Sequence, residues 1–215
     1  MNQHFIIMPK QEILFEPDQI YHIYNHANGH ENLFEHQDHY LLFLNTFIEK
    51  CSTTFKTYAF VLMPNHFHFI LKVRNSNNPP LALGENEKIF NQNDHFEYEF
   101  SRSISQKFSN FLNSYAQKYN YKVRRKGSLF RENTRRKLLD TDTYLKTAIK
   151  YVHFNPVKDG FCKDPKDWSY SSYGFLLNGD DLILPVKEVI KLYGGQKKFL
   201  IEHEERDIKK IEFNW

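Results

Sequence analysis

The sequence predicts an α+β fold, in which an antiparallel β-sheet carries helices on one face. Runs of β-forming residues alternate with amphipathic segments of helical periodicity, in the order strand, helix, strand, strand, helix, strand, helix. In the middle of this order, two strand-like runs are separated only by Pro64 and Asn65. Such a short polar break favours a tight turn, and therefore an antiparallel hairpin.

The first half of the chain has clear local signals. Residues 19–27 alternate enough to predict a strand, and Asn28-Gly29 marks the turn that ends it. Residues 37–51 place apolar side chains at helical spacing. Residues 55–63 and 66–73 are rich in β-formers and are expected to be the two strands of the hairpin.

The second half is less regular. Residues 75–98 are polar and predict a long loop or an insertion. Residues 102–121 predict a helix, and residues 129–139 predict a strand rich in Arg and Lys. Asp140 or a neighbour is expected to cap a further helix, which Asn155-Pro156 should stop.

The chain is expected to form one domain over residues 19–175, with an N-terminal arm at 1–18 and a helical extension at 176–215, because 215 residues suit one compact domain. No segment approaches the ~18 consecutive apolar residues of a membrane span. The N-terminal apolar stretch is too short for a signal peptide. Cys51 and Cys162 lack the spacing of a metal or disulfide framework. We therefore expect a cytoplasmic protein.

His66 and His68 are the sharpest chemical feature. Residues two apart on a strand point to the same face, so the two imidazoles should stand side by side, roughly 7 Å apart at the backbone. This arrangement suits two ligands of one divalent metal ion. Phe67 and Phe69 point to the other face, where a core is expected.

The surrounding residues resemble those of HUH-type single-tyrosine nucleases, and in particular the REP-associated tyrosine transposases and their insertion-sequence relatives. The resemblance runs in order over about residues 19–175, through Tyr21–Asn25, Asn32–Phe34, Met63–Leu71, Ser114–Asn120, Gly127–Phe130, Tyr151–Val157 and Trp168–Tyr173. It implies a ferredoxin-like or RRM-like sheet of the HUH endonuclease type. Relatives often carry Arg where this chain has His26.

The resemblance implies a metal-dependent transposase that cleaves single-stranded DNA and rejoins it in DNA transposition and recombination. Tyr115 is the expected nucleophile, forming a 5′-phosphotyrosine. His66 and His68 are the expected ligands of Mg²⁺ or Mn²⁺, with Asn120 as the third ligand, although Asn120 can instead cap the helix end. Tyr119 is expected to be a packing residue. The expected substrate is single-stranded or hairpin DNA, and the protein is expected to be a monomer or a homodimer.

A basic tract is the expected DNA-binding surface. Eight cations fall within sixteen residues, a density that suits phosphate binding although it also occurs on merely soluble surfaces: Lys122, Arg124, Arg125, Lys126, Arg131, Arg135, Arg136 and Lys137. The net charge of +3 carries little weight beside this clustering.

Two alternatives stay open. A metallohydrolase would use His66 and His68 with a water nucleophile, and would give Tyr115 no role. A DNA-binding protein without catalytic activity would keep the fold and the basic surface. Replacement of Tyr115 by Phe, followed by a search for a covalent protein–DNA adduct, separates these possibilities from the transposase.

Overall fold

The computed structural model describes residues 13–75, 92–181 and 183–204, and gives no side chains for 92–95. Most of the predicted N-terminal arm, of the predicted 75–98 loop and the end of the C-terminal extension lie outside these residues. The elements are β1 (Ile20–His26), α1 (Gln37–Cys51), β2 (Phe55–Met63), β3 (His66–Val73), α2 (Gln92–Lys122), β4 (Arg135–Leu138), α3 (Asp142–Lys158), the 3-10 turn η1 (Pro165–Asp167), α4 (Tyr173–Asn178), α5 (Val186–Leu192) and α6 (Gln196–Glu204).

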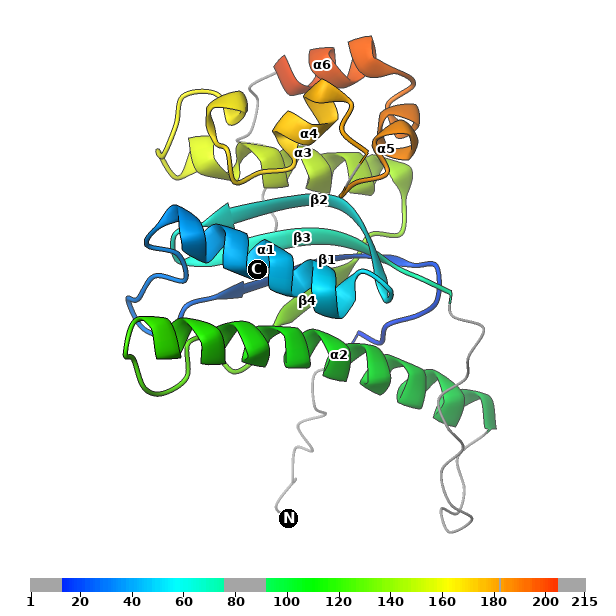
Figure 1. Ribbon diagram of the computed structural model, residues 1–215. Helices are drawn as coiled ribbons and strands as arrows, with labels where there is room; N and C mark the ends of the chain where they lie inside the picture. The colour runs from blue at the N-terminus through cyan, green and yellow to red at the C-terminus, as the bar shows by residue number, and fades with distance from the viewer. Residues whose placement is uncertain (1–12, 76–91, 182, 205–215) are drawn as a thin grey trace, which may run out of the picture.

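The four strands form one antiparallel sheet in the order β2-β3-β1-β4 (Figure 1). The predicted α+β class is confirmed, and the hairpin of β2 and β3 has the predicted bounds. The predicted fourth strand, however, is reduced to four residues. Phe130, inside the predicted range, makes only an isolated bridge to Ala27.

The helices cover both faces of the sheet, whereas one covered face was predicted. Helices α1 and α2 lie on one face and α3 lies on the other, with α4, α5 and α6 beyond it (Figure 1). The side chains of β3 alternate between these layers. Phe67 and Phe69 pack into the core beneath α1 and α2, whereas Ile70 packs into the core beneath α3.

Helix α3 does not stop at Asn155-Pro156, as predicted, but continues to Lys158 with Pro156 inside it. Thr141 caps its start by accepting a hydrogen bond from the Tyr144 amide at 3.2 Å. Proline has no amide donor and its ring crowds the carbonyl four residues earlier, and here both effects fall at the last turn of the helix. The continuation keeps Asn155 helical, one turn after Tyr151.

Helix α2 begins ten residues before the predicted start, at Gln92. The described part of the C-terminal extension contains α5 and α6, which contribute Val189 and Phe199 to the core beneath α3. No helix within the described residues has the length and apolar character that crossing a membrane requires.

Candidate active site

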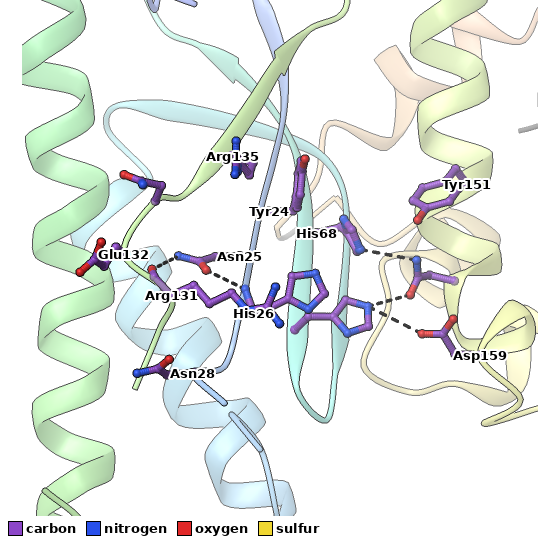
Figure 2. Close-up of a pocket in the computed structure, with 13 residues that line it drawn as sticks. Tyr24, Asn25, His26, Asn28, His68, Arg131, Glu132, Arg135, Tyr151 and Asp159 are labelled. Atoms are coloured by element: carbon purple, nitrogen blue, oxygen red, sulfur yellow. Dashed lines mark hydrogen bonds and ion pairs between the residues drawn. The ribbon is translucent and has the colours of Figure 1, made fainter. Parts of the chain in front are cut away.

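An open cavity of about 840 Å³ lies between α3, the facing strands β1 and β3, and the segment that leads into β4 (Figure 2). Strand β3 contributes both histidines of the predicted pair, as period-two alternation requires. The residues that surround the cavity are Tyr24, Asn25, His26, Asn28, His66, His68, Arg131, Glu132, Asn133, Arg135, Tyr151, Asn155 and Asp159.

Hydrogen bonds hold the two imidazoles in place, with ring centroids 5.1 Å apart. His66 Nδ1 lies 2.7 Å from Asn65 Oδ1, and His68 Nδ1 lies 2.9 Å from His22 Nε2. In both rings, therefore, the Nδ1 side is engaged. The Nε2 atoms point across to Asn155, at 3.0 Å from its Oδ1 for His66 and 3.5 Å from its Nδ2 for His68.

Burial keeps both imidazoles neutral at neutral pH. It lowers the pKa of His66, a shift that a hydrogen bond to Asn155 and the nearby Asp159 carboxylate partly oppose. It lowers the pKa of His68 far below the usual range, and the neighbouring His22 adds to this shift. A neutral imidazole has one unprotonated nitrogen, which is the form that binds a metal ion.

The donors fit a divalent ion. Asn65 Oδ1 can only accept a hydrogen bond, so His66 carries its proton on Nδ1 and presents the Nε2 lone pair to Asn155 Oδ1. This nitrogen and this oxygen lie 3.0 Å apart, and both are atoms that can bind a metal ion. Two imidazoles and an amide oxygen suit Mn²⁺ or Mg²⁺. Among the described residues, no group of three or more His, Cys, Asp or Glu is placed to hold a metal, and the oxygen that faces His66 Nε2 belongs to Asn155.

Tyr151 stands on α3 opposite the histidine pair. Its ring centroid lies 5.7 Å from that of His68, at an interplanar angle of 87°. Figure 2 shows its hydroxyl turned into the cavity on the His68 side. Burial raises the pKa of the Tyr151 phenol and the Asp159 carboxylate adds to the shift, while a hydrogen bond with Asn155 opposes it. The Lys158 ammonium lies 5.3 Å from the ring centroid.

Tyr115, the predicted nucleophile, is on the wrong side of the sheet. It lies on α2 in the core beneath α1 and α2, with 0% of its surface exposed. Its hydroxyl donates a hydrogen bond of 2.5 Å to the Leu33 carbonyl. Burial raises the pKa of its phenol far above the usual range. The sheet separates Tyr115 from the face that carries His66 and His68, so the structure contradicts the predicted juxtaposition.

Asn120, the predicted third ligand, is also remote from the two histidines. It lies near the end of α2, where its amide donates to the Gly127 carbonyl at 3.0 Å and its Oδ1 accepts from Arg125 at 3.2 Å. The structure therefore assigns it to fixing the loop after α2. Tyr119 is buried, as expected of a packing residue, with its hydroxyl 3.3 Å from the Asn32 carbonyl.

The predicted basic tract divides into groups with different surroundings. Only Arg131 and Arg135 line the cavity, and both are exposed. Arg124 and Lys126 are exposed on the loop after α2. Lys137 lies 5.4 Å from the centroid of the Tyr144 ring.

The other cations of the tract are held by the protein itself. Lys122 pairs with Asp38 at 3.0 Å. Arg125 forms an ion pair with Glu31 and donates to the carbonyls of the loop after α2. Arg136 lies 4.4 Å from the centroid of the Phe15 ring and donates to Ser105 Oγ at 3.0 Å. These three side chains stabilise the fold, and the structure does not bring the eight cations together as one surface.

The sequence contained a signal for the residues that were missed. Tyr151 and Asn155 are four apart, which puts them on one face of a helix that continues past Pro156. The prediction that the helix stops at Asn155 assigned Asn155 to a turn and concealed this pairing. His26 was noted only as a departure from relatives, but its ring stacks on His66 with centroids 4.7 Å apart.

Comparisons with known proteins agree with this fold. No family model matches the sequence. A curated protein of Haemophilus influenzae, named as a REP-associated tyrosine transposase, is 26% identical over 120 residues, which cover 55% of this chain and 59% of that protein. The alignment thus spans less than two thirds of the relative.

A solved structure described as a REP-associated tyrosine transposase bound to a REP hairpin has the same fold. The match has a TM-score of 0.58 and a sequence identity of 14%, and it covers 83% of this chain and 90% of the other. The chain is therefore similar to REP-associated tyrosine transposases, in sequence over 120 residues of the curated relative and in fold over most of the solved structure.

Proposed function

We propose that this chain is a metal-dependent transposase and single-strand DNA endonuclease whose nucleophile is Tyr151. One observation carries the proposal. Helix α3 brings a phenol and an amide, Tyr151 and Asn155, against the two Nε2 atoms that His66 and His68 direct into the same cavity. A nucleophile beside a set of metal donors in an open cavity is what covalent phosphodiester cleavage requires.

The chemical step is an in-line displacement at phosphorus. The Tyr151 Oη forms a bond to the phosphorus atom, and the bond from phosphorus to the 3′-oxygen breaks. The phenol gives up its proton and the departing 3′-oxygen takes one up, so the products are a 5′-phosphotyrosine and a free 3′-hydroxyl. Attack by a 3′-hydroxyl reverses the step and joins two strands. Because the phosphotyrosine conserves the bond energy, strand transfer needs no nucleotide cofactor.

The phenol needs help, because burial raises its pKa. A divalent ion held by His66 Nε2, His68 Nε2 and Asn155 Oδ1 would neutralise charge on the phosphate oxygens and favour the phenolate. The protein's own contribution is positioning. His22 and Asn65 fix the two imidazoles, and α3 fixes Tyr151 against them.

The proposed substrate is hairpin DNA with adjoining unpaired nucleotides. The solved structure with this fold is described as bound to a REP hairpin. In this chain Arg131 and Arg135 are exposed at the cavity and can neutralise phosphates of the bound strand. Every proposed site residue comes from one chain, so a monomer is sufficient for cleavage.

The test is the formation of a covalent adduct. The protein is mixed with Mn²⁺ and labelled hairpin oligonucleotides that carry unpaired tails, and the products are separated on a denaturing gel. We expect a labelled band at the mass of protein plus DNA. The band should be absent with EDTA and absent for Tyr151→Phe. Cleavage that persists in Tyr151→Phe would indicate a water nucleophile and overturn the proposal, as would DNA binding without any cleavage.

A further inference from the structure

A second cavity, of about 480 Å³, adjoins the candidate active site. One wall is a face of α2, and the other is the segment 127–134 that leads into β4. Both cavities are lined by Asn25, Arg131 and Glu132, so they flank this segment, the first on the side of α3 and the second on the side of α2. Arg131 and Glu132 are exposed where the two cavities approach each other.

The α2 wall is polar. Ser109, Asn113 and Gln117 follow one another at intervals of four residues, so they share one face of the helix. All three are exposed. Within the part of the chain that the structure describes, no hydrogen bond joins these three side chains to another group, although the same cavity contains amides that are engaged.

The engaged amides hold the opposite wall. Asn25 donates to the Arg131 carbonyl at 3.1 Å and to Thr134 Oγ1 at 3.0 Å, and Asn120 donates to the Gly127 carbonyl at 3.0 Å. These contacts fix the segment against β1 and α2. Hydrogen bonds therefore fix one wall of the cavity. The side-chain amides of Asn113 and Gln117, on the other wall, make no hydrogen bond within the described residues.

We propose that this cavity binds an unpaired nucleotide next to the cleaved phosphate, and that Asn113 and Gln117 contact the edge of its base. The inference rests on the proposed function, because the occupant is the DNA strand that passes through the active site. A carboxamide offers one donor and one acceptor, the pattern that matches adenine best. Arg131 neutralises the phosphate between the cavities, and the Glu132 carboxylate, which lines both cavities, disfavours a second phosphate beside it.

The test measures binding and needs no cleavage. All proteins carry Tyr151→Phe. Fluorescence anisotropy gives the affinity for an eight-base-pair hairpin with no tail, and for the same hairpin with four unpaired deoxyadenosines or four deoxythymidines at its 5′ or 3′ end. We expect one deoxyadenosine tail to bind more tightly than its deoxythymidine counterpart by roughly 5- to 150-fold, the range of a bidentate amide–base contact.

Two double variants decide the assignment. Asn113→Ala with Gln117→Ala should abolish the preference for deoxyadenosine and leave the affinity for the hairpin without a tail unchanged. Gln106→Ala with Asn110→Ala removes a hydrogen-bonded pair at an exposed position of the same helix, outside the cavity, and should keep the preference. A preference that survives the first double variant, or is missing from the parent protein, overturns the inference. A chain that never forms a covalent adduct can still pass this test.

Discussion

His22 Nε2 lies 2.9 Å from His68 Nδ1, on the side of the His68 ring that faces away from Asn155. Both rings are buried, and burial lowers the pKa of His22 to about 3, so the contact joins two neutral imidazoles. One of them donates and the other accepts. If His22 accepts, it fixes the proton of His68 on Nδ1 and leaves Nε2 free for a metal ion.

Replacement of His22 by Phe keeps a ring of similar size and removes that hydrogen bond. We expect the affinity for Mn²⁺, measured by isothermal titration calorimetry, to fall roughly 10- to 100-fold, the usual effect of losing a partner that orients a ligand. His39 is a buried histidine on α1, on the other face of the sheet, and His39→Phe should leave the affinity unchanged. Equal affinities in all three proteins would contradict the proposed role of His22.

Tyr115→Phe should affect stability and not catalysis. The change removes the donor to the buried Leu33 carbonyl, so the free energy of unfolding should fall by about 1–2 kcal/mol. Urea unfolding measures this loss. The variant should still form the covalent adduct with hairpin DNA. A protein of normal stability that forms no adduct would restore the role that the sequence resemblance gave to Tyr115.

Two neighbouring arginines on β4 should differ in their effect on DNA binding. Arg135 is exposed at the cavity, so Arg135→Ala should weaken binding and reduce the slope of log affinity against log salt by about 1. Arg136 contacts Phe15 and Ser105, so Arg136→Ala should lower the free energy of unfolding by about 1–2 kcal/mol and leave the slope unchanged. Identical slopes for the two variants would count against the proposed DNA path.

Acid should unfold the protein through its buried histidines. His203, on α6, lies 3.0 Å from His153 on α3, and burial lowers its pKa from 6.5 to about 4. The unfolded chain takes up this proton below pH 6.5 and the folded chain only near pH 4, so stability is complete above 6.5 and falls between 6.5 and 4. The shift corresponds to about 3 kcal/mol.

His203→Gln tests this pH dependence. Urea unfolding at pH 8, 6 and 5 should show a smaller loss of stability on acidification for His203→Gln than for the wild-type protein. The His203→Gln variant should keep part of the acid sensitivity, because burial also lowers the pKa of His22. If acidification destabilises the two proteins equally, His203 does not contribute to acid unfolding.

The hairpin and the histidine pair were predictable because their signals are local. Two β-forming runs with only Pro64 and Asn65 between them leave one simple arrangement, and period-two alternation then puts His66 and His68 on one face. The helix that covers the face of His66 and His68, α3, could not be predicted from local signals. Whether a helix covers one face or the other depends on long-range packing, and both faces of β3 carry side chains that can be buried.

The proposed nucleophile was missed for a related reason. A tyrosine at helical spacing among aromatic residues looks the same whether it packs in a core, as Tyr115 does, or lines a cavity, as Tyr151 does. The expectation that Pro156 ends a helix removed Asn155 from consideration. The number of Lys and Arg residues in a short stretch also does not show which of them pair within the fold. Arg125 pairs with Glu31, whereas Arg135 is exposed.

The identity of the tyrosine that bonds to DNA tests the proposed role of Tyr151 most directly. The wild-type protein is reacted with Mn²⁺ and a hairpin oligonucleotide, digested with nuclease and trypsin, and analysed by mass spectrometry for peptides that carry a nucleotide. We expect the modification on the peptide that contains Tyr151, with His66 and His68 both required for its formation. A nucleotide found on the peptide of Tyr115, or on any other tyrosine, would contradict the proposed role of Tyr151.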